Sequence, residues 1–136
     1  MQTIVFPDAE ALAVSHVNAQ LTALFAETAR ASTKTTNASA FVTVRRTGGN
    51  AVFVIDNARL TFEAWATTEV AAQLLASRVR GIMLAVDQIT YQGTTYQTYE
   101  PQELAAPANN PDPETADKYA RYTWTVQIGI RGTAIN

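Results

Sequence analysis

The chain has 136 residues, of which 47% are hydrophobic and 16% are charged, and its formal net charge is −2. This length fits one globular domain over residues 1–136, and the acidic balance disfavours a protein that grips nucleic acid through its phosphates. The absence of cysteine excludes disulfides, zinc–thiolate sites and thiol catalysis. The sequence shows neither a signal peptide nor an apolar run of about 18 residues, so we expect a soluble intracellular product.

Residues 8–30 predict a first helix, which opens at Pro7 and Asp8. Apolar side chains recur at helical spacing and form the expected buried stripe, namely Val14, Val17, Leu21, Leu24 and Phe25. No charged residue lies between Glu10 and Glu27, and the face opposite the stripe is small and uncharged: Leu12, Ser15, Ala19, Thr22, Ala23 and Ala26. Such a face can pack closely against another subunit, although alanine is also simply a good helix former.

The segment FVTVRRTGGNAVFVID predicts a β-hairpin. Its two strands are residues 41–46 and 51–56. The turn between them, residues 47–50, contains Gly48 and Gly49, which supply the positive φ angles that hairpin turns need. The polar, small residues before this hairpin predict a linker.

A third strand is predicted at residues 58–66, after a break at Asn57, because apolar and polar side chains alternate there. One face of this strand carries Leu60, Phe62 and Ala64. Trp65 falls on the opposite, polar face, where it has no evident role in a core. We expect Trp65 either to contact a partner or to pack under a neighbouring loop.

The second half of the chain predicts a helix, a hairpin, a long loop and a strand. The helix starts at Thr67 or Thr68 and runs to about Val86, with Gly81 inside it. Its expected buried stripe is Ala71, Leu75, Val79, Ile82 and Val86. The later elements are a hairpin or bulged strand at 88–99, an acidic and proline-rich loop at 101–118 and a final strand at 119–132.

This order of elements predicts an α+β fold. We expect a mostly antiparallel β-sheet of about four to six strands, with two α-helices packed on one face.

The residues that carry chemistry in other proteins form no recognisable catalytic or ligand set here. His16 is the single histidine, and the sequence shows neither an orienting group nor a nucleophile for it. The acidic loop residues Asp112, Glu114 and Asp117 lack the spacing of a calcium loop. Asp56 and Glu63 form at most a weak carboxylate pair, and no phosphate-binding glycine motif is present. We therefore expect no catalytic residue, cofactor or metal, and no enzyme.

The paired arginines Arg45 and Arg46 point to opposite faces of their strand, because successive strand residues alternate. Two arginines make a poor grip on DNA, since phosphate binding recruits several cations. An ion pair with an acidic neighbouring subunit suits the planar guanidinium. An exposed, solubilising strand end is the alternative.

Taken in order, these features resemble the tail-terminator proteins of long-tailed bacteriophages, which are also called tail-completion or tail-to-head joining proteins. The resemblance rests on the strand and Gly-Gly turn at Val42–Gly49 and on the strand that ends in Trp-Ala at Asp56–Ala66. An alanine-rich helix follows at once. The last strand comes after a proline-containing loop and carries Tyr119 and Tyr122. The match covers nearly the whole chain as an ordered set of weak features.

The resemblance implies a structural virion protein without enzymatic activity. Family members form a ring, usually a homohexamer, that caps the tail tube, ends its polymerisation and docks onto the head connector. The implied partners are other copies of the chain, the tail tube protein and the connector or stopper protein, with no membrane. DNA crosses the lumen without specific binding. The implied location is the head–tail junction of the virion, after assembly in the host cytoplasm.

A ring of this kind needs two different contact surfaces on each subunit. We take the candidate subunit or partner contacts from the first helix, the arginine hairpin, the third strand and the acidic loop: Leu12, Ala19, Ala23, Ala26, Arg45, Arg46, Gly48, Gly49, Trp65, Asp112 and Glu114. A head-completion or connector-stopper protein is an alternative within the same class. A soluble dimeric α+β binding module with a concave apolar pocket and a small hydrolase are alternatives from other classes.

Overall fold

The computed structural model describes residues 2–135. Its elements in chain order are β1 (Thr3–Val5), α1 (Ala9–Phe25), β2 (Arg30–Ser32), β3 (Ala40–Gly48), β4 (Ala51–Val52), β5 (Ile55–Ala66), α2 (Glu69–Leu84), β6 (Gln88–Tyr91), β7 (Thr94–Gln97), β8 (Gln102–Asn109), β9 (Ala120–Arg131) and β10 (Thr133–Ile135). Within this part of the chain, no helix is long and apolar enough to cross a membrane.

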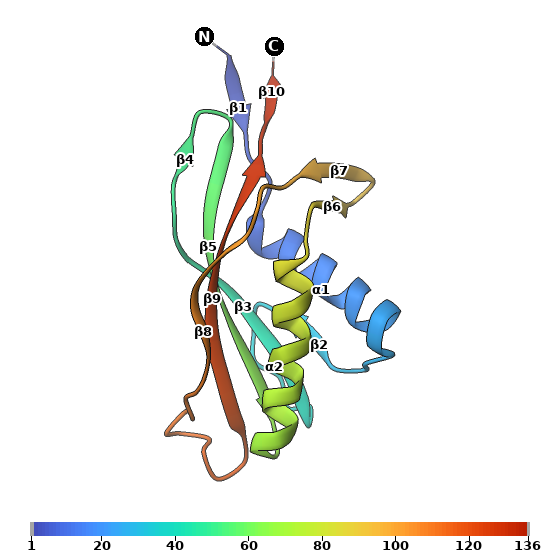
Figure 1. Cartoon of the computed structure of the whole chain (residues 1–136), viewed down its shortest axis with the longest axis vertical. Coiled ribbons are helices and arrows are strands. Elements are labelled where there is room, and N and C mark those ends of the chain that lie inside the picture. Colours follow the sequence, from blue (N-terminus) through green and yellow to red (C-terminus); the bar gives the residue numbers. More distant parts are fainter. Residues whose placement is uncertain (1, 136) are drawn as a thin grey trace.

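The main sheet has six strands in the order β2-β3-β5-β9-β8, and β4 pairs with β5 beside this path. Its pairings are antiparallel except for the short parallel pair of β2 with β3. Two further ribbons, β1–β10 and β6–β7, lie outside the sheet. Both helices lie on the same side of the sheet (Figure 1), and the predicted α+β fold is confirmed. The β1–β10 ribbon has no counterpart in the predicted elements.

The core lies between the helices and the apolar face of the sheet. Alternate residues of β5 and β9 point into it, as the sequence pattern predicts. Phe62 and Trp124 meet edge to face at its centre, with ring centroids 5.4 Å apart. The side chains from these strands and from α2 that build the core are Ala58, Leu60, Phe62, Ala64, Ala72, Leu75, Ala76, Val79, Ile82, Met83, Trp124, Val126, Ile128 and Ile130.

The helix starts agree with their predicted caps. The carboxylate of Asp8 accepts a hydrogen bond from the backbone N–H of Ala11 at 3.2 Å, and the hydroxyl of Thr68 accepts one from Ala71 at 3.1 Å. Helix α2 buries Leu75, Val79, Ile82 and the following Val86 as predicted, whereas Ala71 is exposed.

Helix α1 ends at Phe25 and not near residue 30, so its predicted length is wrong. Ala26 adopts a left-handed conformation with φ 51°, which stops the helix. The chain then turns back as β2, and the side chain of Asn18 fixes this return. Its amide accepts a hydrogen bond from the N–H of Ala31 at 2.7 Å and donates one to the carbonyl of Ala31 at 3.0 Å.

The predicted hairpin has the wrong partner strand. The strand at 41–46 pairs with the far part of β5, from Ala40↔Ala66 to Arg46↔Leu60, while β4 folds back on the first residues of β5. The expected break at Asn57 is absent, because β5 pairs with β9 along its whole length. A register shift after Arg46 ends the regular pairing of β3.

Part of the predicted loop at 101–118 is strand. Residues 102–109 form β8, which pairs with β9 through two register shifts. Pro107 is tolerated because β8 is an edge strand, where a missing backbone donor costs little. Arg80 of α2 holds this edge by two hydrogen bonds to the carboxylate of Glu103, at 2.7 and 2.8 Å. The irregular segment is therefore confined to the residues between β8 and β9.

The turn after β3 depends on Gly49, which has φ 88°, and an added Cβ there would overlap the carbonyl oxygen of Asn57. We expect Gly49→Ala to lower the free energy of unfolding by more than the ~1–3 kcal/mol of backbone strain alone. Gly93→Ala is the matched control, because Gly93 has φ 80° with no atom within 4 Å of an added Cβ. Urea unfolding measures both, and equal losses would contradict the role of the overlap.

Candidate functional site

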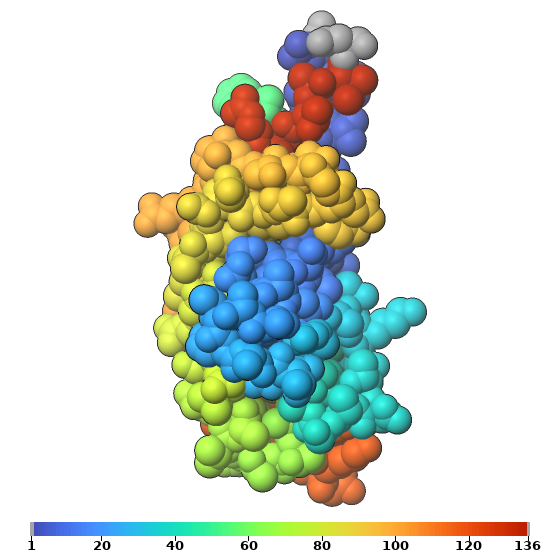
Figure 2. All heavy atoms as spheres, turned by 90° about the vertical axis from the view of Figure 1, so that its right-hand side faces the viewer, coloured from blue at the N-terminus to red at the C-terminus, as the bar shows by residue number. Residues whose placement is uncertain are grey.

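The outward face of α1 is open to solvent. Ala19, Ala23 and Ala26 are all exposed, as predicted. The prediction for Leu12 is wrong, because this side chain is 0% exposed and belongs to the core. Figure 2 shows α1 on the surface of this side of the molecule, below the β6–β7 hairpin. A neutral helix face of small residues is thus available for contact.

The burial pattern of α1 is rotated from the predicted stripe. The buried residues of the helix are Ala9, Leu12, Ala13, Val17 and Leu21. Leu24 and Phe25, which we predicted to be buried, are 62% and 40% exposed. The last turn of α1 lies away from the sheet (Figure 1), and Leu24 and Phe25 line the space between α1 and α2.

Arg46 is a structural residue of the β3 end. Its guanidinium forms two hydrogen bonds with the carboxylate of Asp56, at 2.6 and 2.7 Å, and also donates to the carbonyls of Gly48 and Gly49 at 3.1 Å. Its backbone N–H donates to Glu10 of α1 at 2.7 Å. The hydrogen bond with Asp56 raises the pKa of Arg46. The carboxylate partner of Arg46 is therefore in the same chain, while Gly48 and Gly49 supply turn carbonyls.

Arg45 points to the opposite face, as the strand alternation predicts, and is exposed. That face of the sheet is polar. Thr61 bridges its neighbours through hydroxyl contacts of 3.0 Å with Thr47 and 3.2 Å with Thr125. Near Arg45 the face is hollowed over about 280 Å³ by residues of β3, β5, β9 and two loops: Thr33, Thr35, Thr43, Arg45, Glu63, Trp65, Asp112 and Arg121. Arg45, Trp65 and Asp112, all predicted contact residues, are thus brought together.

Trp65 is not a free contact surface, which corrects its place among the candidates. It is 4% exposed and stacks on Phe41 at 5.4 Å, and the ring of Tyr119 meets it edge to face at 6.1 Å. The hydroxyl of Tyr119 donates to the carbonyl of Ala38 at 2.7 Å. Phe41 of β3 and Tyr119 of the loop before β9 therefore cover Trp65, which agrees with the alternative of packing under a neighbouring loop.

The two acidic loop residues, Asp112 and Glu114, lie in different environments. Asp112 lines the hollow beside Arg45, and its carboxylate accepts a hydrogen bond from the N–H of Glu114 at 3.2 Å, whereas the side chain of Glu114 remains exposed. Among residues 2–135, no group of three or more histidine, cysteine, aspartate or glutamate residues is placed to hold a metal.

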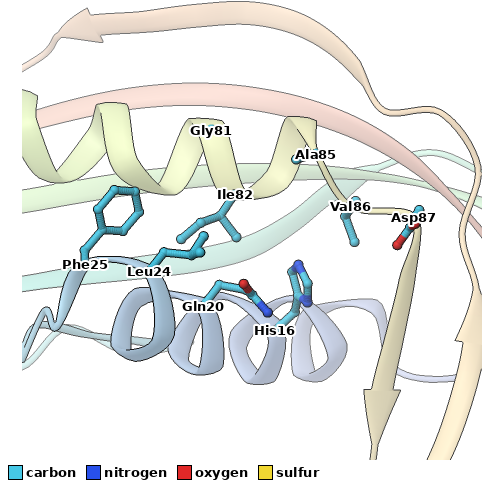
Figure 3. Close-up of a pocket in the computed structure, with 9 residues that line it drawn as sticks. All are labelled: His16, Gln20, Leu24, Phe25, Gly81, Ile82, Ala85, Val86 and Asp87. Atoms are coloured by element: carbon cyan, nitrogen blue, oxygen red, sulfur yellow. The ribbon is translucent and has the colours of Figure 1, made fainter.

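A groove between α1 and α2 is a feature that the sequence reasoning missed. It has a volume of about 430 Å³ (Figure 3) and is lined by His16, Gln20, Leu24, Phe25, Gly81, Ile82, Ala85, Val86 and Asp87. Arg78 lies 5.0 Å above the ring of Phe25 and pairs with Glu27 at 2.8 Å, which holds one end of the groove. The signal in the sequence was Gly81, a glycine inside a helix, whose Cβ position has no atom within 4 Å.

His16 lies at the other end of this groove (Figure 3). Burial lowers its pKa from the usual 6.5, and the nearby Asp87 partly offsets this effect. Within the described part of the chain its imidazole makes no hydrogen bond to a nucleophile. Asp87 is the acidic residue that lines the groove with it.

A second missed feature is the tip of the β4–β5 hairpin. Phe53 is 93% exposed there, and Val52 is 54% exposed. The sequence reasoning placed Phe53 in a regular strand, where it did not stand out from its apolar neighbours.

Neither protein-family models nor curated proteins give a match to this chain. The function must therefore be argued from its surfaces.

The ion pair of Arg46 with Asp56 joins the turn to β5, and Asp56 is nearly buried. We expect Asp56→Ala to lower the free energy of unfolding by about 1–2 kcal/mol, since two charge-assisted bonds are lost at a partly solvated site. Arg46→Met is the partner variant. A double-mutant cycle by urea unfolding should show coupling of similar size, and additive losses would contradict the pair.

The lowered pKa of His16 predicts a pH dependence. The unfolded chain binds more protons than the folded one as the pH falls below 6.5, so stability is lost on going toward the folded pKa. We expect the urea midpoint of the wild type to fall between about pH 7 and pH 5 by more than that of His16→Gln. Parallel falls in the two proteins would contradict this.

Proposed function

We propose that this chain is a structural protein of the tail-terminator type, which forms a ring, most simply a homohexamer, that caps a phage tail tube. The observation that carries the proposal is that one protomer has two unlike uncovered surfaces. One is the neutral α1 face with its adjoining groove, and the other is the polar face of the sheet around Arg45. Closed rings are built from contacts between unlike surfaces of identical subunits.

The charges on the polar sheet face are balanced, which fits a protein that does not hold DNA tightly. Arg121 is neutralised by Glu63 at 3.1 Å, and Asp112 lies in the same hollow as Arg45. A surface with balanced charges neither repels a polyanion strongly nor holds it through many phosphate contacts. We propose that DNA crosses the ring without specific binding. The ring would sit at the head–tail junction of the virion, between tube and connector, after assembly in the host cytoplasm.

The imidazole of His16 makes no hydrogen bond to a nucleophile within the described residues, which favours a structural role over a hydrolase. The apolar groove favours a second candidate function, a soluble dimeric module that binds an apolar ligand or segment between α1 and α2. The oligomeric state separates the two functions, because the module is a dimer at every concentration.

Light scattering behind size-exclusion chromatography at several protein concentrations tests the ring. We expect the mass to rise with concentration toward roughly six protomers. A monomer must instead be recruited to the ends of tubes assembled from the tail tube protein of the same virus, as seen by electron microscopy. A strict dimer, or a monomer that leaves tube ends free, would contradict the proposal.

Single charges test the two surfaces. We expect Ala23→Glu, on the α1 face, and Arg45→Glu, on the sheet face, each to weaken ring formation by about tenfold or more, because a charge is buried without a partner. Gln73→Glu places the same charge on the exposed side of α2 and serves as the control. Wild-type assembly of Arg45→Glu would remove the sheet face from the proposed contacts.

A further inference from the structure

The tip of the β4–β5 hairpin presents an exposed aromatic side chain on a hydrogen-bonded backbone. Phe53 is 93% exposed and has φ 56°. Its neighbours are held, since Val52 pairs with Ile55, and the carbonyl of Val54 accepts a hydrogen bond from Gly132 at 2.7 Å. Apolar groups that are both exposed and ordered are typical anchors of protein contacts.

The α1–α2 groove has the complementary shape and chemistry. Its walls are the apolar side chains of Leu24, Phe25 and Ile82, and its side toward α2 is open because Gly81 has no side chain (Figure 3). Phe53 cannot fill the groove of its own chain, because the hairpin lies at the far upper end of the sheet and on the side away from the helices (Figure 1). An occupant with this side chain must come from another copy.

The charges beside these two features are opposite. Asp87 is exposed at the end of the groove, and within the described residues its carboxylate has no ion-pair partner. Arg131 is exposed beside the hairpin, where it pairs with Ile55 in the sheet. Its guanidinium donates to the hydroxyl of Tyr99 at 3.3 Å and likewise lacks an acidic partner in the described part of the chain. Complementary charge of this kind fixes the register of a contact.

We propose that Phe53 of one copy inserts into the α1–α2 groove of the next copy, with Arg131 of the first facing Asp87 of the second. This inference rests on the proposed ring and names one contact between its neighbouring copies, made by the groove beside the α1 face. The contact joins unlike surfaces, so every protomer offers one tip and one groove. It assigns a partner to the exposed Leu24 and Phe25, which the fold itself leaves uncovered.

Two variants remove the two halves of the contact separately. Phe53→Ser removes the anchor, and Gly81→Leu fills the groove at a position where no atom lies within 4 Å of an added Cβ. We expect each variant alone to associate at least tenfold more weakly than the wild type. Val70→Ser is the matched control, because Val70 is 81% exposed on α2 away from both features. Thermal unfolding verifies that all three variants fold.

Mixing the variants gives the decisive result. A Phe53→Ser protomer keeps its groove and a Gly81→Leu protomer keeps its tip, so an equimolar mixture contains one intact pairing. We expect this mixture to form a one-to-one heterodimer in light scattering and to stop there. Wild-type association of Phe53→Ser, or a mixture that associates no better than its components, would overturn the proposal.

Cross-linking covers the case of a weakly associating wild type. The chain has no cysteine, so Val52→Cys and Gln20→Cys in one chain place the only thiols at the tip and in the groove. A short bismaleimide should link tip to groove between copies, whereas the pair Val70→Cys and Gln20→Cys should not. The absence of this link overturns the inference. If Phe53→Ser still forms rings, the inferred contact is wrong and the proposed function stands. If the cross-link forms but the protein does not cap tubes, the contact stands and the proposed function does not.

Discussion

The uninterrupted pairing of β5 with β9 is the constraint on which the rest of the structure depends. The two strands run antiparallel from Ile55↔Arg131 to Ala66↔Ala120. Because both alternate in the same register, one face of the pair is mainly apolar and the other mainly polar. The apolar face fixes where α2 packs, and the polar face remains open except where the Phe41, Trp65 and Tyr119 cluster covers one end. Both proposed surfaces inherit their positions from this pair.

On the polar face, the side chain of Glu63 connects the central strands. Its carboxylate accepts hydrogen bonds from the hydroxyl of Thr43 at 2.8 Å and from Arg121 at 3.1 Å, and thereby joins all three central strands. Thr43 in turn accepts a bond from the indole of Trp65 at 3.3 Å. Such connected polar groups hold one another in place. The open face is therefore ordered without an apolar cover.

The sequence predicted those features that local pattern controls. Alternation located β9 and the two faces of β5, and capping residues located the starts of both helices.

The errors occur where the structure depends on pairing between residues that are distant in the sequence. Asn57 was predicted to break the strand because asparagine by itself is unfavourable in a strand. In the structure Asn57 is paired with β9, so the strand continues. Strand β8 was missed since Glu103 and Pro107 disfavour a strand unless a neighbour pairs with it. Leu12 is buried and Leu24 is exposed, the reverse of the prediction, because α1 has almost no charged residues to indicate its solvent-exposed face. The groove escaped prediction since its walls come from helices that are far apart in sequence, whereas the exposed alanines of α1 followed from helical spacing alone.

The edge strand β8 has a consequence for any assembly of this protein. Its two register shifts and Pro107 interrupt the row of backbone donors and acceptors that another strand would need. Neighbouring copies are thereby discouraged from extending the sheet across this edge. Contacts made through side chains are short-ranged and specific to their partner groups, so in the proposed ring a few side chains would set the angle between copies. Substitution of those side chains would change this angle while the fold of the subunit stays the same.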